Sequence, residues 1–214
     1  MRLKLLCIGI LFVLSLNQMG LSLSDTEESK LYFEAIVNLK SIEKYFLGEP
    51  IYLSKDERFK SNVRDKLGKI IEYIEQYYQT DSDNPEVLFY LGKCYSYAHD
   101  LDIKGSWRNS VKYLNKLIKI QPDNVMARMI QAKNYMDSQN FEKALKEYEY
   151  ANKLHPNGQA LKFIAVAKIY LKREEEAKED LKLYLKYNPN DRYAEKMLSS
   201  MESGLTEVVN LCSE

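Results

Sequence analysis

The sequence predicts an all-α fold in which antiparallel helix pairs repeat along the chain. Prolines close two intervals of similar length: Pro122 and Pro156 lie 34 residues apart, and Pro156 and Pro189 lie 33 residues apart. Apolar residues recur at spacings of three and four, and no segment alternates with the two-residue period of a strand. A period near 34 residues indicates stacked helical repeats, because each pair buries its apolar face only against its neighbours.

The first residues differ in composition from the rest of the chain. Arg2 and Lys4 precede an uncharged apolar run of twelve residues, Leu5 to Leu16, and the small residues Ser22 and Ser24 follow on either side of Leu23. This order indicates a signal peptide over residues 1–24, so we expect a mature chain that begins near Leu23 or Asp25. An uncleaved N-terminal anchor is the alternative, although the run is shorter than the roughly 20 residues that a membrane span needs.

Residues 25–83 predict an N-terminal helical hairpin. A first helix is expected over residues 26–47, before the Gly48-Glu49-Pro50 break, and a second after the capping-box pattern of Ser54 and Glu57. The apolar faces of the two helices comprise Leu31, Ala35, Ile36, Leu39, Ile42 and Phe46, and then Phe59, Val63, Leu67, Ile70, Ile71 and Ile74. A divergent first repeat is the alternative interpretation, against which bulky Ile70 and Tyr77 occupy positions where small residues are expected.

Residues 84–190 divide into three units, 84–122, 123–156 and 157–190. Small residues recur where the two helices of a unit are expected to touch, because a larger side chain would separate the backbones. They are Gly92, Ala132 and Ala167 in the first helices, and Ala144, Ala151 and Ala177 in the second helices. Together with the aromatic residues and the closing prolines, this pattern resembles the tetratricopeptide repeat (TPR) family. The resemblance implies a TPR-like solenoid of antiparallel helix pairs.

The second unit and the C-terminal end have features of their own. Arg128 and Gln131 stand where apolar residues are expected in the first helix of the second unit, so we expect looser packing against the first unit. Residues 191–203 predict a capping helix with one apolar face, which a solenoid needs to cover its exposed end. Residues 204–214 form a tail.

The composition and the motifs argue against catalysis and nucleic-acid binding. The net charge is zero and both signs are mixed along the helices, so no basic block is available to grip nucleic acid. No nucleophile elbow, phosphate loop or dinucleotide fingerprint occurs. His99 and His155 are interpreted as residues near helix ends, and Asp100 with Asp102 lacks the alternating oxygen ligands of a calcium loop. We therefore expect no enzyme activity, no cofactor and no metal.

Two cysteines, Cys94 and Cys212, remain after removal of the leader. A disulfide in an oxidising compartment is one interpretation. One buried thiol in a helix and one exposed thiol in the tail is the interpretation that we favour, because the two cysteines lie in such different segments.

The family resemblance implies a concave groove lined by the first helices of successive repeats. The residue after each small residue is then expected to face the groove, which gives a column of Lys93, Lys133 and Lys168. An apolar row is expected beside the lysines, and two further residues flank it. These candidate partner-binding residues are Phe89, Met129 and Ile164, extended by Met126 and Leu161 and flanked by Tyr97 and Met136.

The sequence therefore favours a non-enzymatic TPR adaptor, exported to the periplasm or secreted, that binds protein or peptide partners in the bacterial cell envelope. A lysine column over apolar residues suits a partner with acidic and apolar side chains. The alternative is a structural subunit of a membrane-associated complex, tethered by an uncleaved N-terminal helix. The carboxylate clamp that grips chaperone C-termini is not supported, because Asn134 lies one residue away from the position that the clamp requires.

Overall fold

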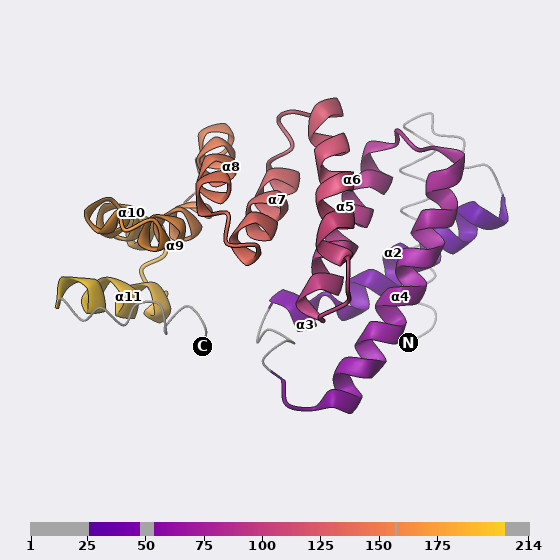
Figure 1. Cartoon of the computed structure of the whole chain (residues 1–214), viewed down its shortest axis with the longest axis horizontal. Coiled ribbons are helices and arrows are strands. Elements are labelled where there is room, and N and C mark those ends of the chain that lie inside the picture. The colour runs from indigo at the N-terminus through magenta and orange to yellow at the C-terminus, as the bar shows by residue number, and fades with distance from the viewer. Residues whose placement is uncertain (1–25, 48–53, 157, 204–214) are drawn as a thin grey trace.

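The computed structural model describes residues 26–47, 54–156 and 158–203, and the regular structure in these residues is helical, without strands. Helix pairs follow one another along the long axis of the molecule (Figure 1). The predicted all-α helical-repeat fold is confirmed. The predicted signal peptide, Cys212 and the tail lie outside the described residues.

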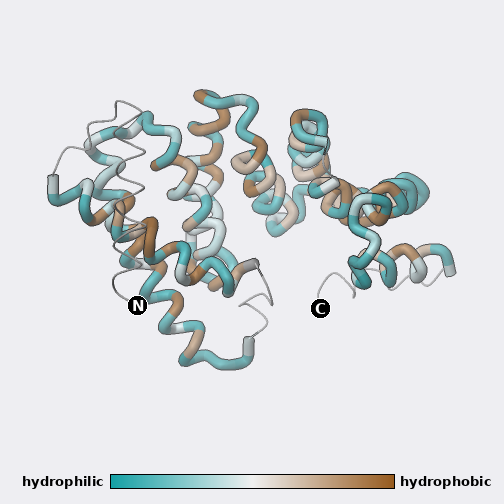
Figure 2. The backbone as a smooth tube through the Cα atoms, turned by 180° about the vertical axis from the view of Figure 1, so that it is seen from behind, coloured by the Kyte–Doolittle hydropathy of each residue, from teal (hydrophilic) through white to brown (hydrophobic). Residues whose placement is uncertain are grey.

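The three repeats are three antiparallel helix pairs. Their bounds are α5 Pro85–Asp100 with α6 Ser106–Ile120, α7 Val125–Asp137 with α8 Phe141–Leu154, and α9 Leu161–Tyr170 with α10 Glu174–Tyr187. α11 Arg192–Glu202 packs against α10 at the C-terminal end. Apolar and polar stretches alternate along the helices, as expected when only one face is buried (Figure 2).

The small residues predicted at the helix contacts are buried, and Gly92 shows why size matters there. A Cβ atom on Gly92 would lie 2.6 Å from Cγ and Cδ2 of Leu114 in α6, closer than packed carbon atoms approach. α5 and α6 therefore pack closely only because this position lacks a side chain. Side-chain caps set two of the helix starts, since Asn124 accepts a hydrogen bond from the Ala127 N–H and Asp191 accepts one from the Ala194 N–H.

The same turn ends the first helix of every repeat. Asp102, Gln139 and Lys172 have φ angles of 59°, 58° and 62°, in the left-handed region. The residue after each donates its N–H to a carbonyl five positions earlier, as in the 2.8 Å bond from Asn140 to Tyr135. This is the Schellman geometry, which usually has glycine at the left-handed position. The repeat is thus more regular in backbone than in sequence.

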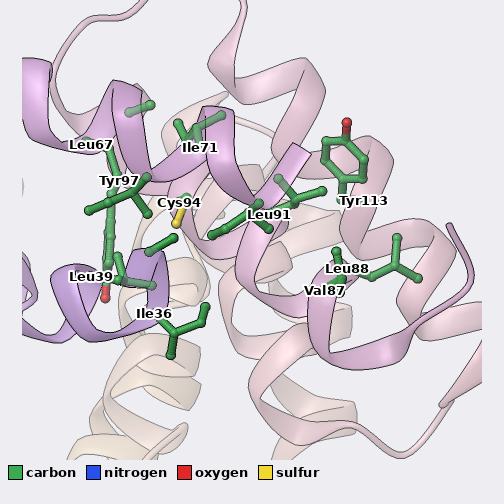
Figure 3. Packing of buried hydrophobic residues seen from close by; sticks show 14 of the residues in the cluster. Ile36, Leu39, Leu67, Ile71, Val87, Leu88, Leu91, Cys94, Tyr97 and Tyr113 are labelled. Atoms are coloured by element: carbon green, nitrogen blue, oxygen red, sulfur yellow. The ribbon is translucent and has the colours of Figure 1, made fainter. Parts of the chain in front are cut away.

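The N-terminal hairpin consists of α2 Glu27–Ile42 and α4 Glu57–Thr80, with the short helix α3 Lys44–Leu47 after α2. α4 packs against α2 and α5, and Leu39, Leu67 and Cys94 from these three helices lie in one apolar cluster (Figure 3). Two details differ from the prediction. The helix expected over residues 26–47 is interrupted at Glu43, and the N-cap of α4 is Asp56, which accepts a hydrogen bond from the Phe59 N–H, while Ser54 accepts one from Asp56.

The apolar core is divided where the first repeat meets the second. One cluster joins the helices up to α6 with Ala127 of α7, and another joins α7 to α11. Between the clusters lies a buried polar network centred on Asn134, which donates to Ser110 Oγ at 2.7 Å and accepts from Ser96 Oγ at 3.0 Å. Trp107 Nε1 also donates to the Asn134 carbonyl at 2.9 Å. Directional bonds therefore fix the register of these two repeats.

Arg128 and Gln131, for which we expected looser packing against the first unit, both have polar partners on neighbouring helices. Gln131 is buried and donates to Asn115 Oδ1 of α6 at 2.9 Å. Arg128 forms a 2.6 Å ion pair with Glu147, and its guanidinium lies 3.9 Å from the ring centroid of Tyr150. Polar partners on neighbouring helices replace the expected apolar contacts.

Candidate functional site

The first helices of the first two repeats lie side by side, because α5 packs directly against α7. The predicted groove residues of α5 are Phe89, Lys93 and Tyr97, one turn apart from each other, and we call them the α5 stripe. The Lys93 ammonium lies 5.7 Å from the Phe89 ring centroid and 5.9 Å from that of Tyr97. The structure thus brings the three residues together as one cationic and aromatic strip.

The α5 stripe is already in contact with the N-terminal hairpin. Lys93 donates to the carboxylate of Glu43, at the end of α2, and the Tyr97 ring stacks on Phe46 of α3 with centroids 4.1 Å apart. Tyr97 is buried, and the Lys93 side chain is 19% exposed. The prediction placed these residues in an open groove, whereas in the structure the chain itself covers them.

The predicted residues of α7 are the most accessible of the set. Met126 is 53% exposed, and Met129 and Met136 are half-buried against the second apolar cluster. The Lys133 side chain is 42% exposed and forms ion pairs with Asp100 at 2.6 Å and Asp137 at 2.7 Å. We call Met126, Met129, Lys133 and Met136 the α7 face.

The ion pairs of Lys133 alter the protonation equilibria around it. Burial lowers the pKa of the Lys133 ammonium, but the two carboxylates outweigh this effect and the net pKa is raised. Burial raises the pKa of Asp100, and Lys133 opposes that shift only in part. At neutral pH, Lys133 is therefore a firmly charged group whose charge is balanced within the chain.

The predicted residues of α9 belong to the core. Leu161 and Ile164 are buried in the second apolar cluster. The Lys168 side chain is 10% exposed and pairs with Asp180 of α10 at 2.6 Å and with Glu176 at 3.5 Å. The prediction that these three residues line an open groove is wrong for the chain as it stands, because Leu161 and Ile164 are buried in the core and Lys168 is held by acids of α10.

The lysine column is thus matched by acids that the sequence analysis did not assign to it. The carboxylates lie far from the lysines in the sequence, with Glu43 50 positions before Lys93 and Asp100 33 positions before Lys133. Both acids stand at the end of the preceding first helix. The same pairing of an acid with the lysine of the next first helix therefore occurs twice. A comparison of the three units with one another could have revealed it, except that Glu43 lies in the N-terminal hairpin, outside those units.

The remaining candidates for chemistry have structural roles. Burial raises the pKa of the Cys94 thiol, which is free and fully covered, so it lacks the thiolate character of a nucleophile. Across residues 26–47, 54–156 and 158–203, no group of three His, Cys, Asp or Glu side chains is placed to hold a metal ion. Asn134 is buried, and its side-chain amide is bonded to Ser96 and Ser110 in the inter-repeat network. No helix of the described chain is long and apolar enough to span a bilayer.

These helix pairs, stacked in register with a capping helix, define a solenoid of helical repeats. A family model described as tetratricopeptide repeat matches residues 86–124, which include most of α5 and all of α6. Residues 86–124 thus match a tetratricopeptide repeat, and the helix pairs that follow share the fold of such repeats. A comparison with curated protein sequences gave no match.

Solved structures of low sequence identity share the fold. MamA 41-end from Desulfovibrio magneticus RS-1 is 15% identical, with a TM-score of 0.64, and the match covers 89% of this chain and 92% of that chain. MamA AMB-1 is 19% identical, with a TM-score of 0.62 and 86% coverage of both chains. The first TPR of Spaghetti (RPAP3), bound to HSP90 peptide SRMEEVD, is 23% identical, with a TM-score of 0.50, and the match covers 59% of this chain and 99% of that chain.

Proposed function

We propose that this chain is a non-enzymatic adaptor that binds a protein or peptide partner on the α7 face. The observation that carries the proposal is the accessibility of Met126, Met129 and Met136 beside a charged Lys133 on a first helix of a TPR solenoid. Methionine side chains adapt their shape to different apolar surfaces. A partner with apolar and acidic side chains would bury the former against the methionines, and the latter would compete with Asp100 and Asp137 for Lys133.

The structure of the Spaghetti TPR with an HSP90 peptide supports the general mode, because that protein with the same repeat type binds a peptide. Its peptide is not proposed as the ligand here. Asn134, the nearest candidate for a clamp asparagine, is occupied by Ser96 and Ser110. Recognition in this chain instead rests on apolar contact with one charged group at its centre.

The proposal is tested by capture from a bacterial envelope extract with the full chain as bait. Met129→Ala should reduce the recovered amount of a specific partner and speed its dissociation, since a buried anchor typically contributes on the order of 1–2 kcal/mol. The matched control is Ile120→Ala, which removes an exposed apolar side chain at the end of α6. A partner whose dissociation rate is the same from both variants would contradict the proposed surface.

Export is the second part of the proposal and rests on the leader sequence. The basic start, the apolar run and the small residues Ser22 and Ser24 predict a cleaved signal peptide and a periplasmic or secreted chain. Intact-mass measurement on protein from its native compartment should give a chain that begins near Leu23 or Asp25. A chain that retains Arg2 would instead favour the tethered subunit of a membrane-associated complex.

A further inference from the structure

The segment from Glu43 to Leu47, which we call segment 43–47, departs from the regular path of α2. Glu43 stands between α2 and α3, and its carbonyl accepts a hydrogen bond from the Phe46 N–H at 2.9 Å, a bond over three residues instead of four. The tighter turn places two side chains on α5 at once. Glu43 binds Lys93 and Phe46 stacks on Tyr97, with their ring planes 10° apart.

The effect of segment 43–47 is clear from a comparison of two equivalent lysines. Lys93 and Lys133 occupy the same position in the first helices of neighbouring repeats, directly after the small residues Gly92 and Ala132. The Lys133 side chain is 42% exposed, whereas that of Lys93 is 19% exposed. Glu43 reaches Lys93 together with the aromatic ring of Phe46, which stacks on Tyr97. Asp100, by contrast, reaches Lys133 from the last turn of the long helix α5. The α5 stripe is therefore covered where the α7 face is open.

Segment 43–47 is held by contacts with α5 and α4 and by the first apolar cluster, against which Tyr45 and Phe46 pack. α3 has four residues, too few for a helix that is stable without external contacts. Apart from the two contacts with α5, Tyr45 packs edge-on against Phe59 of α4, with ring centroids 5.0 Å apart. A ligand that competes for α5 must therefore offer the same groups, a carboxylate for Lys93 and an aromatic ring for Tyr97.

We propose that segment 43–47 is an internal occupant of the binding surface, and that a partner reaching the α5 stripe displaces it with the same chemistry. This rests on the proposed function and deepens it. The displacing peptide carries a carboxylate for Lys93 and, three residues later, an aromatic ring for Tyr97. Such a partner binds over α5 and α7 together, whereas a partner without these groups is confined to the α7 face.

The segment itself supplies the probe. A fluorescent peptide with the sequence of residues 41–47 is titrated against the full chain and against the variant Glu43→Ala/Phe46→Ala, and binding is followed by anisotropy. The tethered segment competes in the wild type at an effective concentration in the millimolar range. We therefore expect the variant to bind the peptide at least about tenfold more tightly than the wild type does.

Three controls separate occupancy from an altered fold. Glu34→Ala/Val37→Ala removes an exposed acid and an exposed apolar residue, also three positions apart, from α2, and should behave as the wild type. A peptide with the Glu43→Gln and Phe46→Ala changes should not bind. Adding Lys93→Ala to the double variant should abolish peptide binding, with circular dichroism showing an unchanged helix content.

Equal affinity of the wild type and the double variant, or no binding to either chain, would overturn the inference. In that case the contacts of segment 43–47 only join the hairpin to the first repeat. The adaptor function would be unaffected by this result, because capture through Met129 is measured separately and does not involve the α5 stripe.

Discussion

Removing the side chain of Asn134 tests whether the polar network joins the first two repeats. Asn134→Ala deletes the bonds to Ser96 and Ser110 and leaves the buried Ser96 hydroxyl without its acceptor. Each lost bond costs about 1 kcal/mol net, and an unsatisfied buried group costs about 1–3 kcal/mol. The higher helix propensity of alanine returns roughly 0.5 kcal/mol. We expect a net loss of about 2–4 kcal/mol in the free energy of unfolding.

The measurement is urea denaturation followed by far-ultraviolet circular dichroism. With a slope of about 2 kcal/mol per molar, the midpoint should fall by about 1–2 M. Asn62→Ala is the matched control, because Asn62 is exposed in the interior of α4 and shares only the change in helix propensity. In the double variant Ser96→Ala/Asn134→Ala the orphaned hydroxyl is removed, so its loss should be smaller than the sum of the two single losses. A midpoint for Asn134→Ala equal to that of Asn62→Ala would refute the reasoning.

Other changes test the packing, the turns and the charges separately. Gly92→Ala should destabilise the chain by about 1–3 kcal/mol through the clash with Leu114, whereas Gly68→Ala, with no atom within 4 Å of the added Cβ, should stabilise it by about 1 kcal/mol in the same urea assay. Gln139→Gly should raise the melting temperature slightly, since glycine relieves the left-handed strain at a cost in chain entropy, for a net gain of roughly 0.5 kcal/mol. Burial alone would raise the pKa of Asp191, but its hydrogen bonds lower the pKa from 3.8 to about 2. Because the folded pKa lies below the unfolded one, the stability that this carboxylate provides is present above about pH 4 and is lost as the pH falls toward 2. Urea midpoints at several pH values should show a smaller acid dependence for Asp191→Asn, and an unchanged dependence would contradict this assignment.

The fold could be predicted from the sequence because it depends on residues that have few alternatives. Prolines cannot continue a helix, and only small residues fit where two helices touch. The spacing of both residue types along the sequence therefore indicates the length of the repeat. The Schellman turns escaped prediction because Asp102, Gln139 and Lys172 are not glycines. Their geometry is imposed by the packing of the flanking helices, which no local pattern records.

The candidate site was less predictable, since an exposed position in a helix does not reveal what will approach it. The spacing identified Lys93 and Lys133 as equivalent residues, and their equivalence holds in the structure. It did not reveal that Glu43 and Asp100 would reach them from the preceding first helices. Local periodicity determines which face of a helix a residue is on, whereas the stacking of the repeats determines its partners.

The division of the core explains why α7 has large apolar side chains that the fold does not fully bury. α5 buries Val87, Leu88 and Leu91, and α9 buries Leu161, Ile164 and Ile169, so their large residues are used in folding. α7 buries only Ala127, Gln131, Ala132 and Asn134, which are small or polar. Met126 is 53% exposed and contributes little to the fold, whereas Met129 and Met136 pack half-buried against the second cluster and leave only part of their apolar surface to a partner. Met126→Ala should then leave the urea midpoint nearly unchanged while it shortens the lifetime of a complex. A large loss of stability in this variant would show that the methionines serve the core, and the α7 face would cease to be a candidate for binding.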